Sequence, residues 1–137
     1  LAVYVVLKFQ HRRRFLRTIH QARIGVDELA LMLASADPPA VIDLGHPDEI
    51  AADGVVLPGA RRIPAAELER RRGEIPSGRD VVLYCNCPNE ASSAAMAMKL
   101  RRLGFPRARP LAGGLDTWRA AGRPVDPAGP VTQPRIK

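Results

Sequence analysis

The sequence predicts a single α/β domain with a mainly parallel central sheet flanked by helices. Short apolar segments alternate with longer helical patterns along the chain, which is the order expected of strands joined by helices. The clearest apolar segment, residues 80–84, is β-branched and does not alternate with polar residues, so it suits a strand buried on both faces of a parallel sheet. The chain has 137 residues, which fits one domain with a real core.

The same patterns place the remaining elements. Helices are expected at residues 26–35, 64–72, 90–103 and 115–121. Strands or short extended pieces are expected at residues 40–44, 54–59, 60–63 and 107–111, and a turn leading into a short helix at 46–50. We therefore expect the domain at residues 26–126, preceded by a basic segment at 1–25 and followed by a loose tail at 127–137. Proline and polar residues dominate the chain from Pro124 onward, which is the basis for expecting a loose end.

Positive charge is concentrated at the N-terminus. Six of the 21 lysines and arginines, and none of the 14 acids, lie in residues 1–25, so the rest of the chain is close to neutral. The three arginines at 70–72 have acids at 67, 69 and 74 around them, which is typical of a solvated helix face. The charge pattern therefore does not predict a nucleic-acid-binding domain.

The N-terminal segment begins with seven apolar residues, 1–7, and a basic cluster at 11–17 follows. Seven residues are far fewer than the roughly 20 needed to span a bilayer, and a signal peptide carries its charges before the apolar run. The pattern is typical of the last turns of a transmembrane helix that leaves the membrane through a basic collar. Such a collar would place the domain at the cytoplasmic face of a membrane, in a bacterium the inner membrane. The alternative is an amphipathic helix packed on a partner or on its own domain.

The two cysteines, Cys85 and Cys87, do not form a disulfide framework, and a bridge between such near neighbours would be strained. They indicate a reducing compartment and either thiol chemistry or metal binding. A zinc site needs more ligands, and His11, His20 and His46 have no metal-like spacing. We therefore expect neither a metal nor another cofactor.

Cys85 follows the strand expected at 80–84 and precedes the helix expected at 90–103. In an open parallel sheet, ligands bind just beyond the carboxyl ends of the strands. Loop N–H groups and the positive end of the helix would lower the pKa of the Cys85 thiol and would hold an anion beside its sulfur. The local pattern equally suits a small buried hydrophobic residue at a strand end.

Four motifs in order resemble the rhodanese, or single-domain sulfurtransferase, family over residues 26–125. They are VIDL at 41–44, Gly54 with LPGA at 57–60, VVLYC at 81–85, and LAGGLDTW at 111–118 followed by AGRPV at 121–125. The resemblance implies a rhodanese-like three-layer fold. It also implies that Cys85 accepts a sulfane sulfur as a persulfide, from a thiosulfate- or persulfide-type donor, and passes it to a thiol or cyanide. The active-site loop implied by the resemblance consists of Asn86, Cys87, Pro88, Asn89, Glu90 and Ala91, and the amides of Asn86 to Glu90 would hold the persulfide and the donor anion.

Two features depart from the family pattern. The usual loop has a glycine near its middle and an arginine five residues past the cysteine, where this chain has Pro88 and Glu90. Glu90 would repel an anionic donor, so a less charged persulfide would be preferred to thiosulfate. Alternatively, Glu90 points outward and Asn89 caps the helix. Gly45 stands where the family usually places an arginine after the strand aspartate.

Three residues have roles that the pattern leaves open. Cys87 would receive sulfur from Cys85 or act as a resolving thiol, or it only fills the loop. Asp43 is expected to support the site by fixing loops through backbone N–H groups. Trp118 is expected in the core.

The function that the resemblance implies is sulfur transfer, with a small sulfur donor, a thiol acceptor and a membrane as partners and no nucleic acid. The N-terminal segment and the altered loop together resemble the junction of a DedA-type membrane protein with a C-terminal rhodanese domain. The alternative is a non-catalytic rhodanese-like module, for binding or redox sensing, attached to a membrane protein. A phosphatase of the Cys-x5-Arg type is rejected because its arginine would fall at Ala91.

Overall fold

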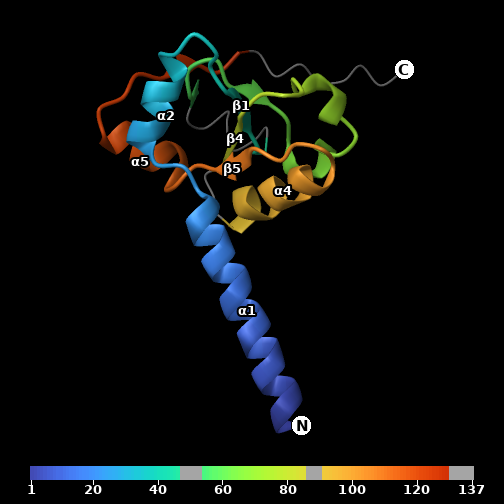
Figure 1. The fold of residues 1–137 in the computed structure, drawn as a ribbon. Helices are drawn as coiled ribbons and strands as arrows, with labels where there is room; N and C mark the ends of the chain where they lie inside the picture. Colours follow the sequence, from blue (N-terminus) through green and yellow to red (C-terminus); the bar gives the residue numbers. More distant parts are fainter. Residues whose placement is uncertain (47–53, 86–90, 130–137) are drawn as a thin grey trace.

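A four-stranded parallel sheet forms the centre of the domain in the computed structural model, which describes residues 1–46, 54–85 and 91–129 (Figure 1). Its strand order is β3-β1-β4-β5, and all three pairs are parallel. The strands are Arg61–Arg62 (β3), Ala40–Asp43 (β1), Val81–Tyr84 (β4) and Ala108–Pro110 (β5). The predicted parallel sheet is confirmed, and the strand predicted from its apolar run, β4, lies inside it.

Helices cover both faces of this sheet, which gives the predicted three layers. Helices α2 (Val26–Leu33) and α5 (Gly114–Ala120) pack on one face, and α4 (Ala91–Arg102) packs on the other (Figure 1). Successive side chains of a strand point to opposite faces. The two clusters accordingly take alternate residues: Val82 and Tyr84 pack with α2 and α5, whereas Leu83 packs with α4.

Trp118 lies in the core, as expected. Its side chain is 2% exposed, packs between the sheet and α2, and donates a hydrogen bond from Nε1 to the carbonyl of Pro124 at 2.8 Å. Burial of the large ring with its one polar atom satisfied fixes α5 on the sheet.

The helix expected at residues 64–72 is not formed. Two short 3-10 helices, Ala65–Glu67 (η1) and Arg72–Glu74 (η2), take its place. Between them the backbone leaves the helical region, because Arg71 has φ −98° and ψ 12°. Leu68 and Ile75 are both buried in the core under α4, and this packing overrides the helix propensity of the segment.

The C-terminal segment is ordered further than we expected. Strand β6 (Asp126–Pro127) pairs antiparallel with β2 (Val55–Val56), and the N–H of Ala128 donates to the carbonyl of Gly54 at 2.8 Å. The expectation of a loose end is therefore wrong for residues 126–128. Residues 130–137 lie outside the described part of the chain, as do 47–50 of the turn expected at 46–50.

Helix α1 (Ala2–Ala22) projects from the β5 edge of the domain (Figure 1). Ile24 joins it to that edge through two backbone hydrogen bonds, one donated to Pro110 at 2.9 Å and one accepted from Ala112 at 2.8 Å. Residues 1–14 are exposed, so the alternative that this segment packs on its own domain is wrong for them. No helix among the described residues has the length and apolar character that crossing a membrane requires.

Candidate active site

Cys85 lies at the carboxyl end of β4, an inner strand of the sheet. Strands β1 and β5 flank β4, and Cys85 is partly buried against the cluster that also contains Ile42 and Leu83. The chain then enters α4 at Ala91. The loop residues Asn86, Cys87, Pro88, Asn89 and Glu90 lie outside the described residues, so their roles stay predictions. The predicted order of strand, cysteine and helix is present.

Helix α4 begins at the sheet edge that carries Cys85. It connects two neighbouring parallel strands, β4 and β5, and such a crossover helix runs antiparallel to them. Its basic residues are in the last turn, at Lys99, Arg101 and Arg102, and its first turn has no acid. The positive end of the helix dipole therefore lies on the side of Cys85, which favours a bound anion there.

A turn of two glycines, Gly113 and Gly114, packs directly against the backbone of Cys85. Gly114 starts α5 with φ +57°, and a Cβ atom added to it would lie 2.5 Å from the carbonyl oxygen of Cys85. Gly113 precedes it, also with positive φ. Only glycine allows this approach, so the turn positions the end of β4.

A buried polar cluster lies next to Cys85 on the α2 and α5 side of the sheet. Asp43 is 4% exposed; its Oδ1 accepts a hydrogen bond from the N–H of Gly45 at 2.8 Å, and its Oδ2 accepts one from the Tyr84 hydroxyl at 2.9 Å. The N–H of Leu57 donates to the same hydroxyl at 3.1 Å. Asp43 thus fixes the loop after β1 through a backbone N–H, as expected, while any catalytic role for it stays a prediction.

Tyr84 is the residue of this cluster that we did not predict. A tyrosine at the end of a strand buried on both faces must bring its hydroxyl to a partner, and this was the available signal. Burial raises the pKa of Tyr84 well above its ordinary range, and the neighbouring charge of Asp43 raises it further. Tyr84 therefore stays a neutral hydrogen-bond donor that links β4 to β1 and to the segment at Leu57.

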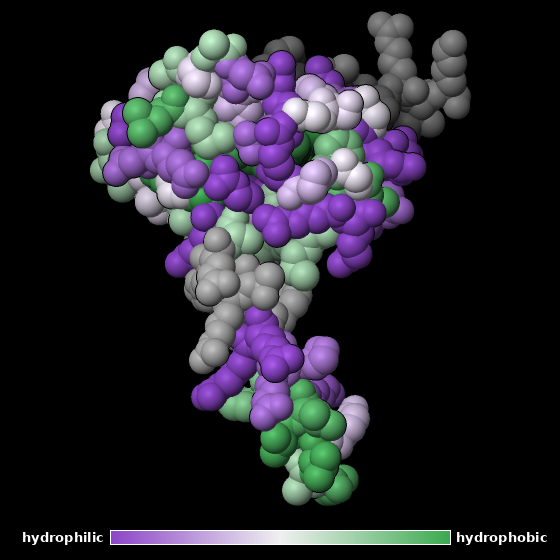
Figure 2. Space-filling view, in the orientation of Figure 1, coloured by the Kyte–Doolittle hydropathy of each residue, from purple (hydrophilic) through white to green (hydrophobic). Residues whose placement is uncertain are grey.

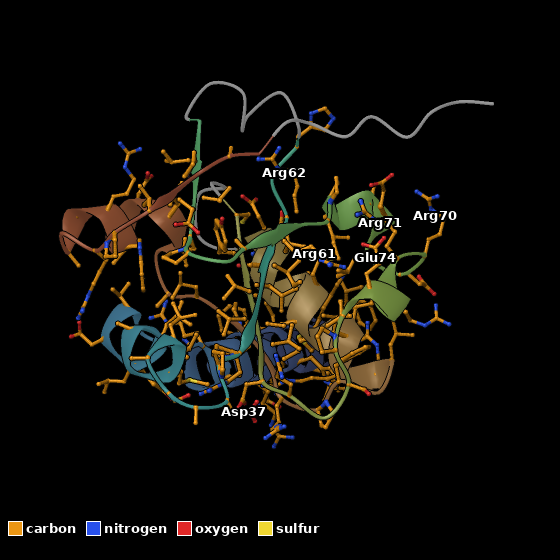
Figure 3. All side chains as sticks on the ribbon, turned by 90° about the horizontal axis from the view of Figure 1, so that it is seen from above. Asp37, Arg61, Arg62, Arg70, Arg71 and Glu74 are labelled. Carbon is orange, nitrogen blue, oxygen red and sulfur yellow. The ribbon has the colours of Figure 1, made fainter. Side chains whose placement is uncertain are left out.

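Arg62 is the cation nearest in register to this cluster, opposite Asp43 on β3. Adjacent residues of a strand point to opposite faces, and Figure 3 shows that Arg61 and Arg62 do so, with Arg61 directed toward Glu74. Arg62 opposes the rise in the Tyr84 pKa, and its Nε is buried. The sequence offered no signal for its position beside Asp43, because the two residues meet only across the sheet.

We expect Tyr84→Phe to lower the free energy of unfolding by about 2 kcal/mol, because it removes the buried hydroxyl that accepts from the N–H of Leu57 and donates to Asp43. Chemical denaturation monitored by circular dichroism measures the change. Tyr4→Phe is the matched control, since Tyr4 is 66% exposed and its loss of a hydroxyl should leave stability unchanged. An unchanged value for Tyr84→Phe would show that the hydroxyl contributes no net stability.

The same residue predicts an alkaline loss of stability. In the unfolded chain Tyr84 ionises near its ordinary value of 10.0, whereas in the fold its pKa is higher. As the pH rises above 10.0, the unfolded state binds fewer protons than the folded state, so the free energy of unfolding falls. Denaturation between pH 9 and 11, about one unit on each side of the unfolded pKa, should show a steeper fall for the wild type than for Tyr84→Phe. Equal slopes would contradict the raised pKa.

Cys85 is disulfide-bonded in the structure, which contradicts the expectation that the two cysteines are not bridged. The sequence contains one other cysteine, Cys87, which lies outside the described residues. A sulfur in a disulfide is an electrophile and not a nucleophile, so uptake of sulfur by Cys85 requires its reduction first.

Fold and site together define a three-layer α/β domain with a cysteine between an inner strand and a helix. The chain belongs to the rhodanese-like domain family, whose model matches residues 25–121. It is 32% identical over 102 residues to a protein of Allochromatium vinosum named sulfurtransferase, and the match covers 74% of this chain and 92% of that one.

Solved structures give the same fold. A full-length protein from Lactobacillus plantarum superposes with a TM-score of 0.72 at 25% identity, covering 87% of this chain and 98% of that one. A rhodanese-related protein from Thermoplasma volcanium superposes with a TM-score of 0.62 at 21% identity, covering 76% of this chain and 96% of that one. The predicted rhodanese-like α/β fold, with its parallel central sheet and flanking helices, is confirmed.

Proposed function

We propose that the protein is a sulfurtransferase in which Cys85 carries the transferred sulfur. The observation that carries the proposal is the position of Cys85, between a central strand and the start of α4, in a chain similar to a named sulfurtransferase. The reduced thiolate attacks the sulfane sulfur of the donor, a Cys85–sulfur bond forms, and the donor's sulfur–sulfur bond breaks. The leaving group, sulfite from thiosulfate or a thiolate from a persulfide, departs with the bonding electron pair.

The second half of the reaction reverses these roles. A thiolate or cyanide attacks the outer sulfur of the Cys85 persulfide, and Cys85 leaves as a thiolate. The sulfur atom is transferred from donor to acceptor without net oxidation or reduction, so the reaction needs no cofactor. The amides of residues 86–91 and the positive end of α4 are proposed to stabilise the persulfide anion and the donor.

Sulfur uptake by the reduced protein tests this proposal. The chain is reduced, freed of reductant, and incubated with thiosulfate or with glutathione persulfide; intact-mass and peptide mass spectrometry then locate the added sulfur. One sulfur on the peptide containing Cys85 is expected. If the folded, reduced protein takes up none from either donor, the enzyme proposal fails and the non-catalytic module replaces it.

Two observations favour redox sensing as the second candidate function. Cys85 is disulfide-bonded in the structure, and the loop departs from the family pattern at Pro88 and Glu90. A sensor would switch between disulfide and dithiol without taking up sulfur. The uptake experiment, repeated before and after reduction, separates a sensor from an enzyme.

Glu90 is proposed to select the donor by charge. Replacing it by glutamine, Glu90→Gln, removes a negative charge beside the site, so the rate with doubly charged thiosulfate should rise several-fold, about the effect of one nearby charge. The rate with a less charged organic persulfide should change less, and the ratio of the two rates is the measurement. A uniform change with both donors would contradict a role in donor selection.

The location of the protein is a separate proposal. We propose that residues 1–25 hold the domain at the cytoplasmic face of a bacterial inner membrane, as in the DedA-type fusion that this segment resembles. The support is the basic cluster at 11–17, since positive charge flanks membrane segments on the cytoplasmic side. Protease treatment of spheroplasts tests this location. The domain should be cleaved only after lysis; cleavage before lysis would place it on the periplasmic side of the membrane.

A further inference from the structure

Residues 1–9, which form the tip of the molecule at the start of α1, expose apolar side chains in all directions around the helix. Apart from Leu31, the exposed large hydrophobic side chains all belong to this tip, among the residues whose burial the structure describes. They are Leu1, Val3, Tyr4, Val5, Val6, Leu7 and Phe9. Figure 2 shows them as a continuous hydrophobic end of the molecule. Because successive residues are rotated by about 100° around a helix, five consecutive apolar residues already surround its axis.

A cationic zone overlaps this apolar tip and continues past it. Lys8 lies over the ring of Tyr4 at 5.8 Å, and Arg13 lies over the ring of Phe9 at 4.7 Å, so the aromatic residues at the end of the tip are next to cations. Arg12 is also exposed, and residues 1–25 contain no acid. Figure 2 shows the change from hydrophobic to hydrophilic along the helix. The segment therefore has two zones in series, one apolar and one cationic.

This arrangement favours a lipid bilayer over a partner protein as the surroundings of the tip. A groove in a partner protein covers one face of a helix and suits an amphipathic pattern, whereas this tip is apolar on every side. The hydrocarbon of a bilayer surrounds a helix completely. Burial in hydrocarbon would therefore remove the apolar side chains of residues 1–7 from water on every side of the helix. The cations then fall at the level of the phosphate groups.

We propose that α1 is a lipid-binding element selective for anionic phospholipids. Residues 1–7 lie in the hydrocarbon, and Lys8, Arg12 and Arg13 contact the phosphate groups at its surface. The proposal deepens the proposed membrane location by naming the lipid chemistry that holds the protein there. It does not depend on the reaction at Cys85, which lies in the domain beyond Ile24.

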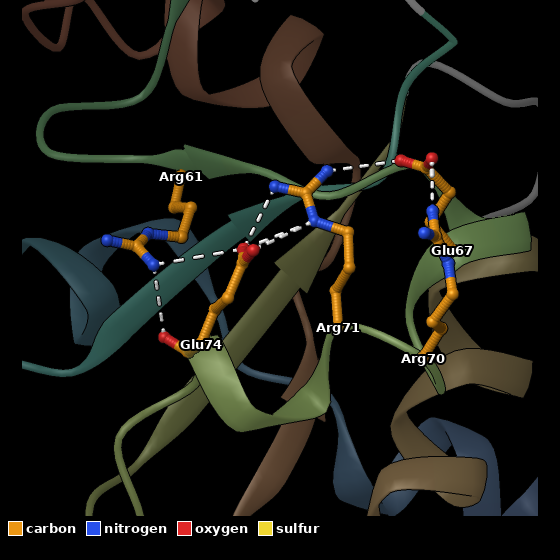
Figure 4. A network of polar contacts seen from close by, with 5 residues as sticks. All are labelled: Arg61, Glu67, Arg70, Arg71 and Glu74. Atoms are coloured by element: carbon orange, nitrogen blue, oxygen red, sulfur yellow. Dashed lines mark hydrogen bonds and ion pairs between the residues drawn. The ribbon is translucent and has the colours of Figure 1, made fainter. Parts of the chain in front are cut away.

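The cations of the domain provide an internal comparison. Figure 4 shows that Arg70 and Arg71 are paired with Glu67 and Glu74, at distances of 2.8 to 3.1 Å. These arginines are therefore neutralised by neighbouring acids, whereas the segment that contains Lys8, Arg12 and Arg13 has no acid of its own.

Vesicle binding of the full 137-residue chain tests the proposal. Sedimentation with vesicles of phosphatidylcholine alone, and of phosphatidylcholine mixed with phosphatidylglycerol, gives the two affinities. We expect much tighter binding to the anionic vesicles, weakened by salt. In Lys8→Gln/Arg12→Gln/Arg13→Gln, binding to anionic vesicles should fall about 100-fold, since each cation near an anionic surface contributes about 1 kcal/mol. In Val5→Gln/Val6→Gln/Leu7→Gln, binding to both vesicles should be lost.

The control is the triple substitution of residues 70–72 by glutamine, which removes the same charge from the domain and should leave vesicle binding unchanged. Equal affinity for the two wild-type vesicles would overturn the selectivity for anionic lipid. Absence of binding, with sedimentation velocity showing that copies associate through the tip, would overturn the lipid assignment altogether. Sulfur uptake is measured on the same samples, so failure of the proposed enzyme activity is distinguished from failure of lipid binding.

Discussion

Replacing Cys85 by serine is expected to reduce sulfur uptake to the background of the reaction without protein. A serine hydroxyl is not ionised near neutral pH and does not form a persulfide, so the sulfur acceptor is removed while the strand end keeps its size. Intact-mass spectrometry after incubation of the reduced variant with glutathione persulfide measures the result. Circular dichroism checks that Cys85→Ser is folded.

The control for this experiment is Cys87→Ser, the other cysteine of the chain. It should keep one added sulfur at Cys85 and should take up sulfur without prior reduction, because no second cysteine is left in the chain to bridge Cys85. Uptake that persists in Cys85→Ser and disappears in Cys87→Ser would move the sulfur acceptor to the loop and refute the proposed role of Cys85. Transfer from Cys85 to Cys87 would instead appear in the fragment-ion spectra of the wild-type peptide, which contains both cysteines, as sulfur on either one.

The sheet could be predicted from the sequence because its signals are local. Strands β1 and β4 are short apolar runs, and every residue of β4 is buried, as the run of apolar residues without alternation predicts. The position of Cys85 follows from the same run, since the residue after a buried parallel strand lies at the edge where ligands bind. The placement of Asp43 at the end of β1 follows in the same way.

The features that could not be predicted depend on contacts between distant segments. The pairing of β2 with β6 joins residues about 70 positions apart, and neither short segment has a pattern of its own. The segment at 65–74 has good helix formers, but the burial of Leu68 and Ile75 decides its shape. The hydrogen bond from Tyr84 to Asp43 forms across two strands and is equally invisible in the sequence.

The motifs that carried the family resemblance have physical explanations in the structure. The N–H of Gly59, in the LPGA motif, donates to Asp126 at 2.9 Å and so helps to hold the C-terminal strand in place. Trp118 fills the core between α5, α2 and the sheet. The two glycines at 113 and 114 bring the start of α5 against the backbone of Cys85. Three of the four motifs therefore hold elements around β4, and only VVLYC contains the proposed sulfur carrier.

Gly114→Ala is expected to destabilise the fold strongly. The methyl group would lie 2.5 Å from the carbonyl oxygen of Cys85, a backbone atom that moves only with β4, and the residue has φ +57°. A left-handed conformation costs a non-glycine residue about 1–2 kcal/mol, and displacement of packed backbone adds about 1–3 kcal/mol. We expect a loss of about 3 kcal/mol in the free energy of unfolding, measured by chemical denaturation, and a slower uptake of sulfur by the protein that remains folded.

Gly122→Ala separates the cost of the positive φ angle from the cost of the collision with the backbone of Cys85. Gly122 has φ +71°, and a Cβ atom there would meet nothing within 4 Å, so its substitution imposes conformational strain without a collision. It should cost about 1–2 kcal/mol and leave the rate of sulfur uptake unchanged. Equal losses of stability and equal uptake in the two variants would show that the close approach of Gly114 to Cys85 does not position the thiol. A greater loss at Gly114, together with slower uptake, would show that the glycine turn sets the position of Cys85.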